Sequence, residues 1–198
     1  MKYLVLLSVA IAVVLSCGCE RQPAATDVPG DNAMTAPVDL DPHDSSILMR
    51  PFSAEEIRDE WVPGFRLLMR RSYPERARIE RWTVVSADDQ GVEIEYATIA
   101  DNGSVEGEPS VSRSGWTELR DHAAFPAAHS TREWVSRSTA LGNFEGWLYR
   151  VAEPGAAVVN EFFFVPELPG APVQMRSLEG DETVFELEQT ARMRPDTN

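Results

Sequence analysis

The chain has few of the side chains that carry out chemistry. Of its 198 residues, two are Cys, three are His, and Lys2 is the single Lys. Both cysteines, Cys17 and Cys19, lie near the N-terminus, so a disulfide cannot cross-link the later chain. That part must fold on its apolar core alone, and a domain of about 150 residues buries about two thirds of the surface that its unfolded chain exposes.

Positive charge is also scarce. The formal net charge is −14 and the calculated isoelectric point is about 4.6. Such a surface repels the phosphate backbone, so we expect no nucleic-acid partner. It also disfavours electrostatic docking of the whole chain on anionic lipid, so attachment to a membrane must have another source.

The sequence lacks the familiar catalytic motifs. It has no G-x-S-x-G nucleophile elbow, no phosphate-binding P-loop and no dinucleotide fingerprint. His122 and His129 have no Cys or Glu partners at metal-ligand spacing. We therefore predict a non-enzymatic protein without a metal or cofactor. A hydrolase that uses a pair of its 32 acidic residues is a weaker alternative, because the fold rather than the spacing sets the separation of two carboxylates.

The N-terminus has the pattern of an export signal. Lys2 precedes a run from Tyr3 to Leu15 that is apolar except for Ser8. This run is too short for a membrane-spanning helix, which needs about 20 residues, but it fits the apolar region of a signal peptide.

Val14-Leu15-Ser16-Cys17 resembles the lipobox of bacterial lipoproteins. The resemblance implies that residues 1–16 are removed and that Cys17 becomes the lipid-bearing N-terminal residue. Several acyl chains such as palmitate would hold it in a membrane, because each buried methylene contributes about 0.8 kcal/mol. Cys19 matches the motif less well, and an ordinary cleaved signal with two unmodified cysteines is the alternative. Gly18 stands where an inner-membrane lipoprotein often has Asp, which favours the outer membrane in an organism with two.

Residues 17–50 form the expected tether. The segment from Glu20 to Arg50 is rich in Pro, Ala, Asp, Thr and Ser and has no aromatic residue. It cannot bury enough apolar area to offset the entropy of ordering, so we predict disorder. The domain proper is expected at residues 51–195.

The domain is predicted to begin with a helix. Ser53 and Glu56 have the spacing of a capping box, and Ile57, Trp61, Phe65 and Leu68 follow at helical spacing. We expect this helix to be kinked or split at Pro63-Gly64 and to end before Tyr73. A second short helix is expected at residues 116–124.

The rest of the pattern alternates like strands and is punctuated by turn residues. Successive strands with short connections favour antiparallel pairing. The predicted class is α+β: one strongly twisted antiparallel sheet, open or curled into a half-barrel, with an N-terminal helix and one short helix packed on it. Strands are expected at residues 80–87, 92–100, 132–139, 144–152, 157–165, 173–177 and 183–193, with hairpin turns at Asp88–Gly91 and Asn102-Gly103.

Two strands carry aromatic or apolar side chains on both faces. Trp147 and Tyr149 lie on one face of the first, and Phe162 and Phe164 on one face of the second. A sheet that is apolar on both sides needs cover on both sides. The simpler interpretation is a central strand covered by a helix on one face and by a loop or curled sheet on the other. The alternative is a curved sheet that encloses an apolar, lipid-like ligand against these four residues.

The segments at residues 115–126, 141–144 and 164–173 resemble a loose group of uncharacterised bacterial lipoproteins with no assigned activity. The order of elements is also similar to the half-barrel carriers of lipoproteins or lipids in the periplasm. We therefore predict an exported, membrane-anchored lipoprotein with a binding or envelope-maintenance role, whose partners are the membrane and an envelope protein or an apolar ligand. A half-barrel carrier of a lipid-like ligand is the alternative.

Overall fold

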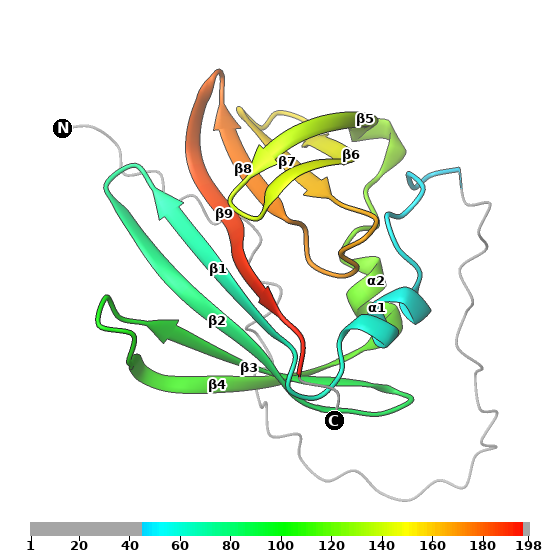
Figure 1. Ribbon diagram of the computed structural model, residues 1–198. Helices are drawn as coiled ribbons and strands as arrows, with labels where there is room; N and C mark the ends of the chain where they lie inside the picture. Colours follow the sequence, from blue (N-terminus) through cyan, green and yellow to red (C-terminus); the bar gives the residue numbers. More distant parts are fainter. Residues whose placement is uncertain (1–44, 196–198) are drawn as a thin grey trace, which may run out of the picture. The chain divides into compact units, whose positions relative to one another are not determined.

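The computed structural model describes residues 45–195, in which two short helices accompany one large sheet (Figure 1). The helices are α1 (Ala54–Glu60) and α2 (Trp116–Asp121), and a 3-10 turn, η2, covers Ala127–His129. The strands are β1 (Arg66–Tyr73), β2 (Arg76–Ala87), β3 (Gly91–Ile99), β4 (Val105–Gly115), β5 (Ser130–Thr139), β6 (Gly142–Ala152), β7 (Val158–Phe164), β8 (Gln174–Glu179) and β9 (Glu182–Met193).

All nine strands belong to one antiparallel sheet with the order β4-β3-β2-β1-β9-β8-β7-β6-β5. Each pair that is adjacent in the sheet is also adjacent in the sequence, except that β1 pairs with β9. The sheet twists strongly but does not close into a barrel, so β4 and β5 are its edges (Figure 1). This confirms the predicted α+β class.

The N-terminal cap of α1 is as predicted. The Glu56 amide donates to Ser53 Oγ at 3.1 Å, and the Ser53 amide donates to Glu56 Oε2 at 2.7 Å. These reciprocal bonds satisfy two amides that the helix itself cannot.

The prediction that this helix extends through Phe65 and Leu68 was wrong. The helix ends at Glu60, and strand β1 starts at Arg66, where buried Leu67 and Met69 alternate with more exposed neighbours. Pro63 lacks an amide, and Gly64 adopts a φ of +88°, so the chain turns there instead of continuing as a helix.

Two smaller differences concern the middle of the chain. Helix α2 ends at Asp121 rather than at Ala124. Strand β4 was missed, because its polar sequence with Gly107 and Pro109 does not look like a strand. Its pairing with β3 provides the hydrogen bonds that the sequence pattern did not indicate.

The aromatic strands β6 and β7 are covered on both faces, as the simpler interpretation predicted. On the helix face, Phe125 lies 4.9 Å from the Tyr149 ring and 4.8 Å from the Phe162 ring. Phe52, just before α1, meets Phe164 edge-on at 6.0 Å. The segments that flank the two helices therefore seal this side of the sheet.

The opposite face has its own small core. Leu148, Phe163, Val165 and Val173 are buried there, and Leu141 and Leu168 pack against them. Leu141 lies in the β5–β6 turn, where the Ala140 amide donates to Glu188 Oε1 of β9 at 2.9 Å. The β5–β6 hairpin thus curls back over the sheet and covers this second face.

Candidate functional site

Three of the four residues predicted to contact an apolar ligand lie in the packed aromatic cluster. Tyr149 and Phe164 are buried, and Phe162 is partly buried against Phe125. The Tyr149 hydroxyl donates to the Met49 carbonyl at 2.6 Å, so the chain just before Pro51 already packs on the domain. A ligand on this face would have to displace these side chains, and ligand binding here stays a prediction.

Trp147, the fourth of these residues, is partly buried and lies between this cluster and the surface. Its ring meets that of Trp134 edge-on at 4.9 Å, and Trp134 is 48% exposed. Arg132 stacks over the same ring, with its guanidinium carbon 3.4 Å from the Trp147 ring centre. Met49 is 72% exposed beside it. We call Met49, Arg132, Trp134 and Trp147 the β5 patch.

Arg132 is unusual among the arginines of this region. Arg137 and Arg150 both pair with Glu161, at 2.7 Å and 2.8 Å. Arg132 has no carboxylate partner in residues 45–195, and its Nε is buried without a hydrogen bond. Its Nη1 donates to the Met49 sulfur at 3.5 Å, and its guanidinium carbon also lies 5.7 Å from the Tyr149 ring centre. The patch therefore combines exposed aromatic area with an uncompensated cation, which suits a partially polar partner.

The patch lies on the outer edge of strand β5, which ends the sheet formed by the described residues. Because two residues link β5 to β6, Thr139 and Gly142 form the hydrogen-bonded pair that closes the hairpin. Counting back along the antiparallel ladder, every second residue of β5 points its backbone N–H and C=O away from β6. These outward residues are Arg132, Trp134, Ser136 and Ser138. Trp134 thus presents both its side chain and its backbone to an incoming strand.

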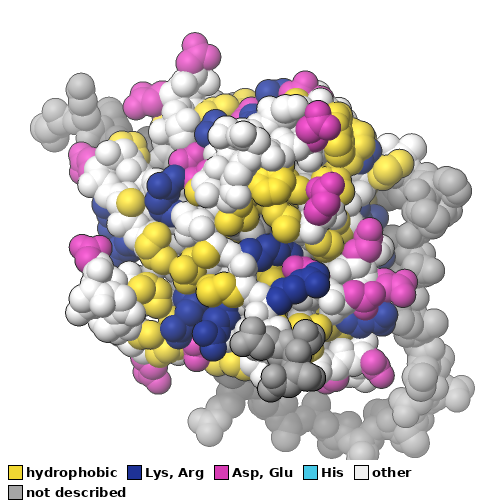
Figure 2. All heavy atoms as spheres, viewed as in Figure 1, with side chains coloured by type: hydrophobic (Ala, Val, Ile, Leu, Met, Phe, Trp, Pro, Cys, Tyr) yellow, Lys and Arg dark blue, Asp and Glu magenta, His cyan; other side chains and the backbone are white. Residues whose placement is uncertain are grey.

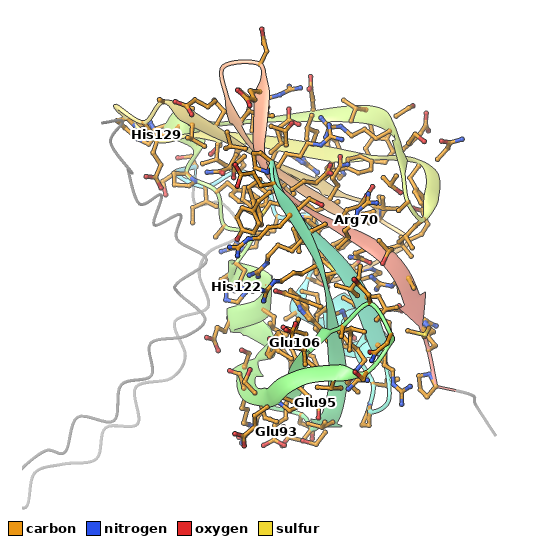
Figure 3. The ribbon with its side chains drawn as sticks, turned by 90° about the vertical axis from the view of Figure 1, so that its left-hand side faces the viewer. Arg70, Glu93, Glu95, Glu106, His122 and His129 are labelled. Atoms are coloured by element: carbon orange, nitrogen blue, oxygen red, sulfur yellow. The ribbon has the colours of Figure 1, made fainter. Side chains whose placement is uncertain are left out.

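The other edge of the sheet is protected. Strand β4 contains Gly107 with a φ of +75°, Pro109, and the exposed Glu106 and Glu108. Its register with β3 shifts between Tyr96 and Thr98, and Figure 3 shows Glu106 on this outer strand. Charge, proline and irregular pairing are the usual means of blocking strand addition. Strand β5 has no Pro or Gly, and its register with β6 is unbroken.

Sequence reasoning missed the contribution of Trp134, Arg132 and Met49 to the patch. Trp134 lies on a predicted strand, but nothing in the sequence indicated that this strand would end the sheet. The contrast with β4 is visible in the sequence only once both edges are known.

Other candidate chemistry is sparse in the part of the chain that the structure describes. His122 lies beyond α2 and His129 in η2, and Figure 3 shows them well apart. No group of three or more His, Cys, Asp or Glu within residues 45–195 could hold a metal. Two open hollows in this part of the chain are lined mainly by polar residues, one beside Arg137 and one beside Glu60.

The predicted lipid anchor is not in the part of the chain that the structure describes. Cys17, Cys19 and most of the predicted tether fall outside the described residues. Within the described range, no helix is both long and apolar enough to cross a membrane.

Comparisons with known proteins give distant structural likenesses. No family model and no curated protein sequence matches the chain. It is similar to a chain in the MucA/MucB complex of Pseudomonas aeruginosa (14% identity, TM-score 0.48) and to one in a complex of MucB with MucA(peri) (13%, 0.47). These likenesses cover 71% and 70% of this chain but 53% and 55% of the others, so the chain spans about half their length.

A third likeness is to a lipoprotein candidate from Parabacteroides distasonis. It has 8% identity and a TM-score of 0.41, and it covers 73% of this chain and 98% of the other. All three likenesses are distant, with identities of 8–14% and TM-scores below 0.5.

Proposed function

We propose that this protein is an exported, lipid-anchored binding protein without enzymatic activity, which takes up an extended segment of another envelope polypeptide along strand β5. The lipobox-like sequence ending at Cys17 supports the anchor. The observation that carries the binding role is the contrast between the two sheet edges, one blocked and one open beside an exposed tryptophan.

Strand addition supplies affinity through backbone hydrogen bonds and specificity through alternate side chains. On β5 the outward backbone groups belong to the residues whose side chains share the face with Trp134. A partner strand would therefore cover Trp134 and place its own side chains beside Arg132. The other charged side chains of β5 are already neutralised, because Glu133 pairs with Arg150 and Arg137 with Glu161.

Ser136 offers a sharp test. Its amide points to the open edge, so Ser136→Pro removes one donor for the partner but none of the backbone hydrogen bonds to β6. Ser136→Ala is the matched control, because both changes remove the hydroxyl that donates to Glu145 at 3.2 Å, but only proline removes the amide. A photo-cross-linking amino acid at position 138, where the exposed Ser138 also points to the open edge and Trp134 is left in place, reports in cells whether a partner occupies β5. The same amino acid at position 111, where Val111 is exposed on β4, reports background.

We expect a specific adduct from position 138 that persists with Ser136→Ala and falls at least tenfold with Ser136→Pro, and none from position 111. Equal adducts in the proline and alanine variants, or no adduct from position 138, would refute strand addition at this edge.

A further inference from the structure

The β1–β2 hairpin carries a charge opposite to that of the rest of the chain. Residues 66–81 contain six of the 17 arginines and only two Glu, which gives them a net charge of +4. Because the whole chain has a net charge of −14, the residues outside the hairpin have a net charge of −18. In Figure 2, dark blue Lys and Arg side chains lie on the left of the view, where Figure 1 places this hairpin, and also over its centre and right.

Part of this charge has no internal partner. Arg70 pairs with Glu188, Arg71 with Glu80 and Arg81 with Glu95. Arg66, Arg76 and Arg78 are exposed and have no carboxylate partner among residues 45–195.

The strand register adds to this imbalance. Arg71 lies directly opposite Arg78, and Tyr73 opposite Arg76, on the same face of the hairpin. Like charges at directly opposite positions destabilise a pair of strands. Glu80 pairs with Arg71 and offsets part of this repulsion, but Arg76 and Arg78 have no carboxylate partner among residues 45–195, which favours an external anion.

The end of the hairpin is also amphipathic. Tyr73 is 39% exposed beside the Pro74-Glu75 turn, and Arg76 lies 5.1 Å from the Tyr73 ring centre. An exposed aromatic ring flanked by arginines suits the boundary between lipid headgroups and acyl chains, where arginine stems lie along apolar surface while the charge reaches phosphate. We call Arg71, Tyr73, Arg76 and Arg78 the arginine tip.

We propose that the arginine tip docks on the phosphate-bearing headgroups of an anionic lipid bilayer and so turns the β1–β2 hairpin toward the membrane. The whole-chain charge does not prevent this, because charges farther than about 8 Å from the surface are largely screened at physiological ionic strength. The proposed anchor at Cys17 would bring the tip within reach, since the 28 residues from Cys17 to Asp44 can span at most about 90–100 Å. The inference rests on the proposed function for that proximity, but the binding itself does not need the anchor.

The test uses the chain from residue 17 onward with Cys17→Ser, so that no acyl chain contributes to binding. Co-sedimentation is measured with vesicles of phosphatidylcholine alone and with vesicles that contain 40% phosphatidylglycerol. Arg76→Gln/Arg78→Gln removes two unpaired cations of the tip. Arg58→Gln/Arg113→Gln is the matched control, because it changes net charge equally at exposed arginines on α1 and β4. Thermal melts monitored by circular dichroism confirm that each variant is folded.

We expect binding to the anionic vesicles only. The tip variant should bind about 30-fold more weakly, since each arginine near an anionic surface contributes about fivefold, and the control variant should change less than threefold. The proposal is overturned by equal binding to both kinds of vesicle, by no binding to either, or by equal losses in the two variants. A chain that ignores the vesicles but binds polyglutamate would assign the tip to an acidic polypeptide instead. None of these outcomes depends on whether Cys17 is lipidated or on what binds β5.

Discussion

Glu161 shows how single residues hold the curled part of the sheet. It lies on β7, is 5% exposed, and receives hydrogen bonds from Arg137 at 2.7 Å and Arg150 at 2.8 Å. Burial alone would raise the pKa of this carboxyl group. The hydrogen bonds and positive charges of the two arginines outweigh that effect and hold its pKa below the usual value.

This lowered pKa predicts a pH dependence of stability. A carboxyl group with a lower pKa in the folded state stabilises the fold above its unfolded pKa of about 4.3, and this contribution is lost as the pH falls through the folded value. Urea unfolding at pH 7 and pH 3.5 should show a steeper loss of stability for wild type than for Glu161→Gln. The exposed Glu167 provides the control, and Glu167→Gln should behave like wild type. An unchanged slope in Glu161→Gln would show that this carboxylate is not the sensor.

At the scale of elements, α1 is fastened to the sheet by a buried ion pair. Glu60, at the end of α1, is 5% exposed and accepts from Arg192 of β9 at 3.0 and 3.1 Å. Arg194 also pairs with Glu60. Arg192 donates to the Pro169 carbonyl at 2.7 Å, as does the Trp61 indole at 3.1 Å. Burial lowers the pKa of Arg192 to about 10, which still leaves it charged at neutral pH.

Removing one partner of this pair should leave a buried charge uncompensated. We expect Glu60→Gln to lower the free energy of unfolding by about 3–5 kcal/mol, measured by urea denaturation. The double variant Glu60→Leu/Arg192→Met removes both charges and should lie close to wild type. Equal destabilisation in the single and double variants would mean that packing, rather than the uncompensated charge, sets the cost.

The sequence predicted the elements whose signals are local. The capping box at Ser53, the hairpin turn before Gly91 and the alternation in β3 depend on neighbouring residues, and the structure has all three. Phe65 and Leu68 misled because residues three apart share one face of a helix, whereas in a strand they point to opposite faces, and β1 buries Leu67 and Met69 instead. The pairing of β1 with β9 could not be predicted, because it joins residues more than 110 positions apart.

The candidate site could not be predicted in full either, because it also depends on contacts between residues that are far apart in the sequence. Trp147 and Tyr149 stood out as an apolar face, but their neighbours Arg132 and Met49 come from other segments. Only the strand order makes β5 an edge, and only then does Trp134 become an exposed anchor for a partner. The sequence-based choice of Phe162 and Phe164 selected side chains that fill the fold beside Phe125.

At the scale of the whole molecule, the two candidate surfaces lie on different parts of one sheet. The β5 patch belongs to one edge strand, whereas the arginine tip belongs to the β1–β2 hairpin in the middle of the strand order. A domain held by its N-terminus, with its basic hairpin against lipid, would leave the β5 edge for a second protein. Both roles suit a domain that stands beside a membrane, where export and the proposed anchor at Cys17 would place it, although the binding of the tip to lipid does not itself need the anchor.

Metabolic labelling of cells with a palmitate analogue tests that anchor most directly. Wild type should carry the label and sediment with membranes, whereas Cys17→Ala should lose the label and Cys19→Ala should keep it. A Cys17→Ala protein that is labelled as strongly as wild type, or a wild-type protein found unlabelled in the cytosol with Met1 in place, would contradict the account.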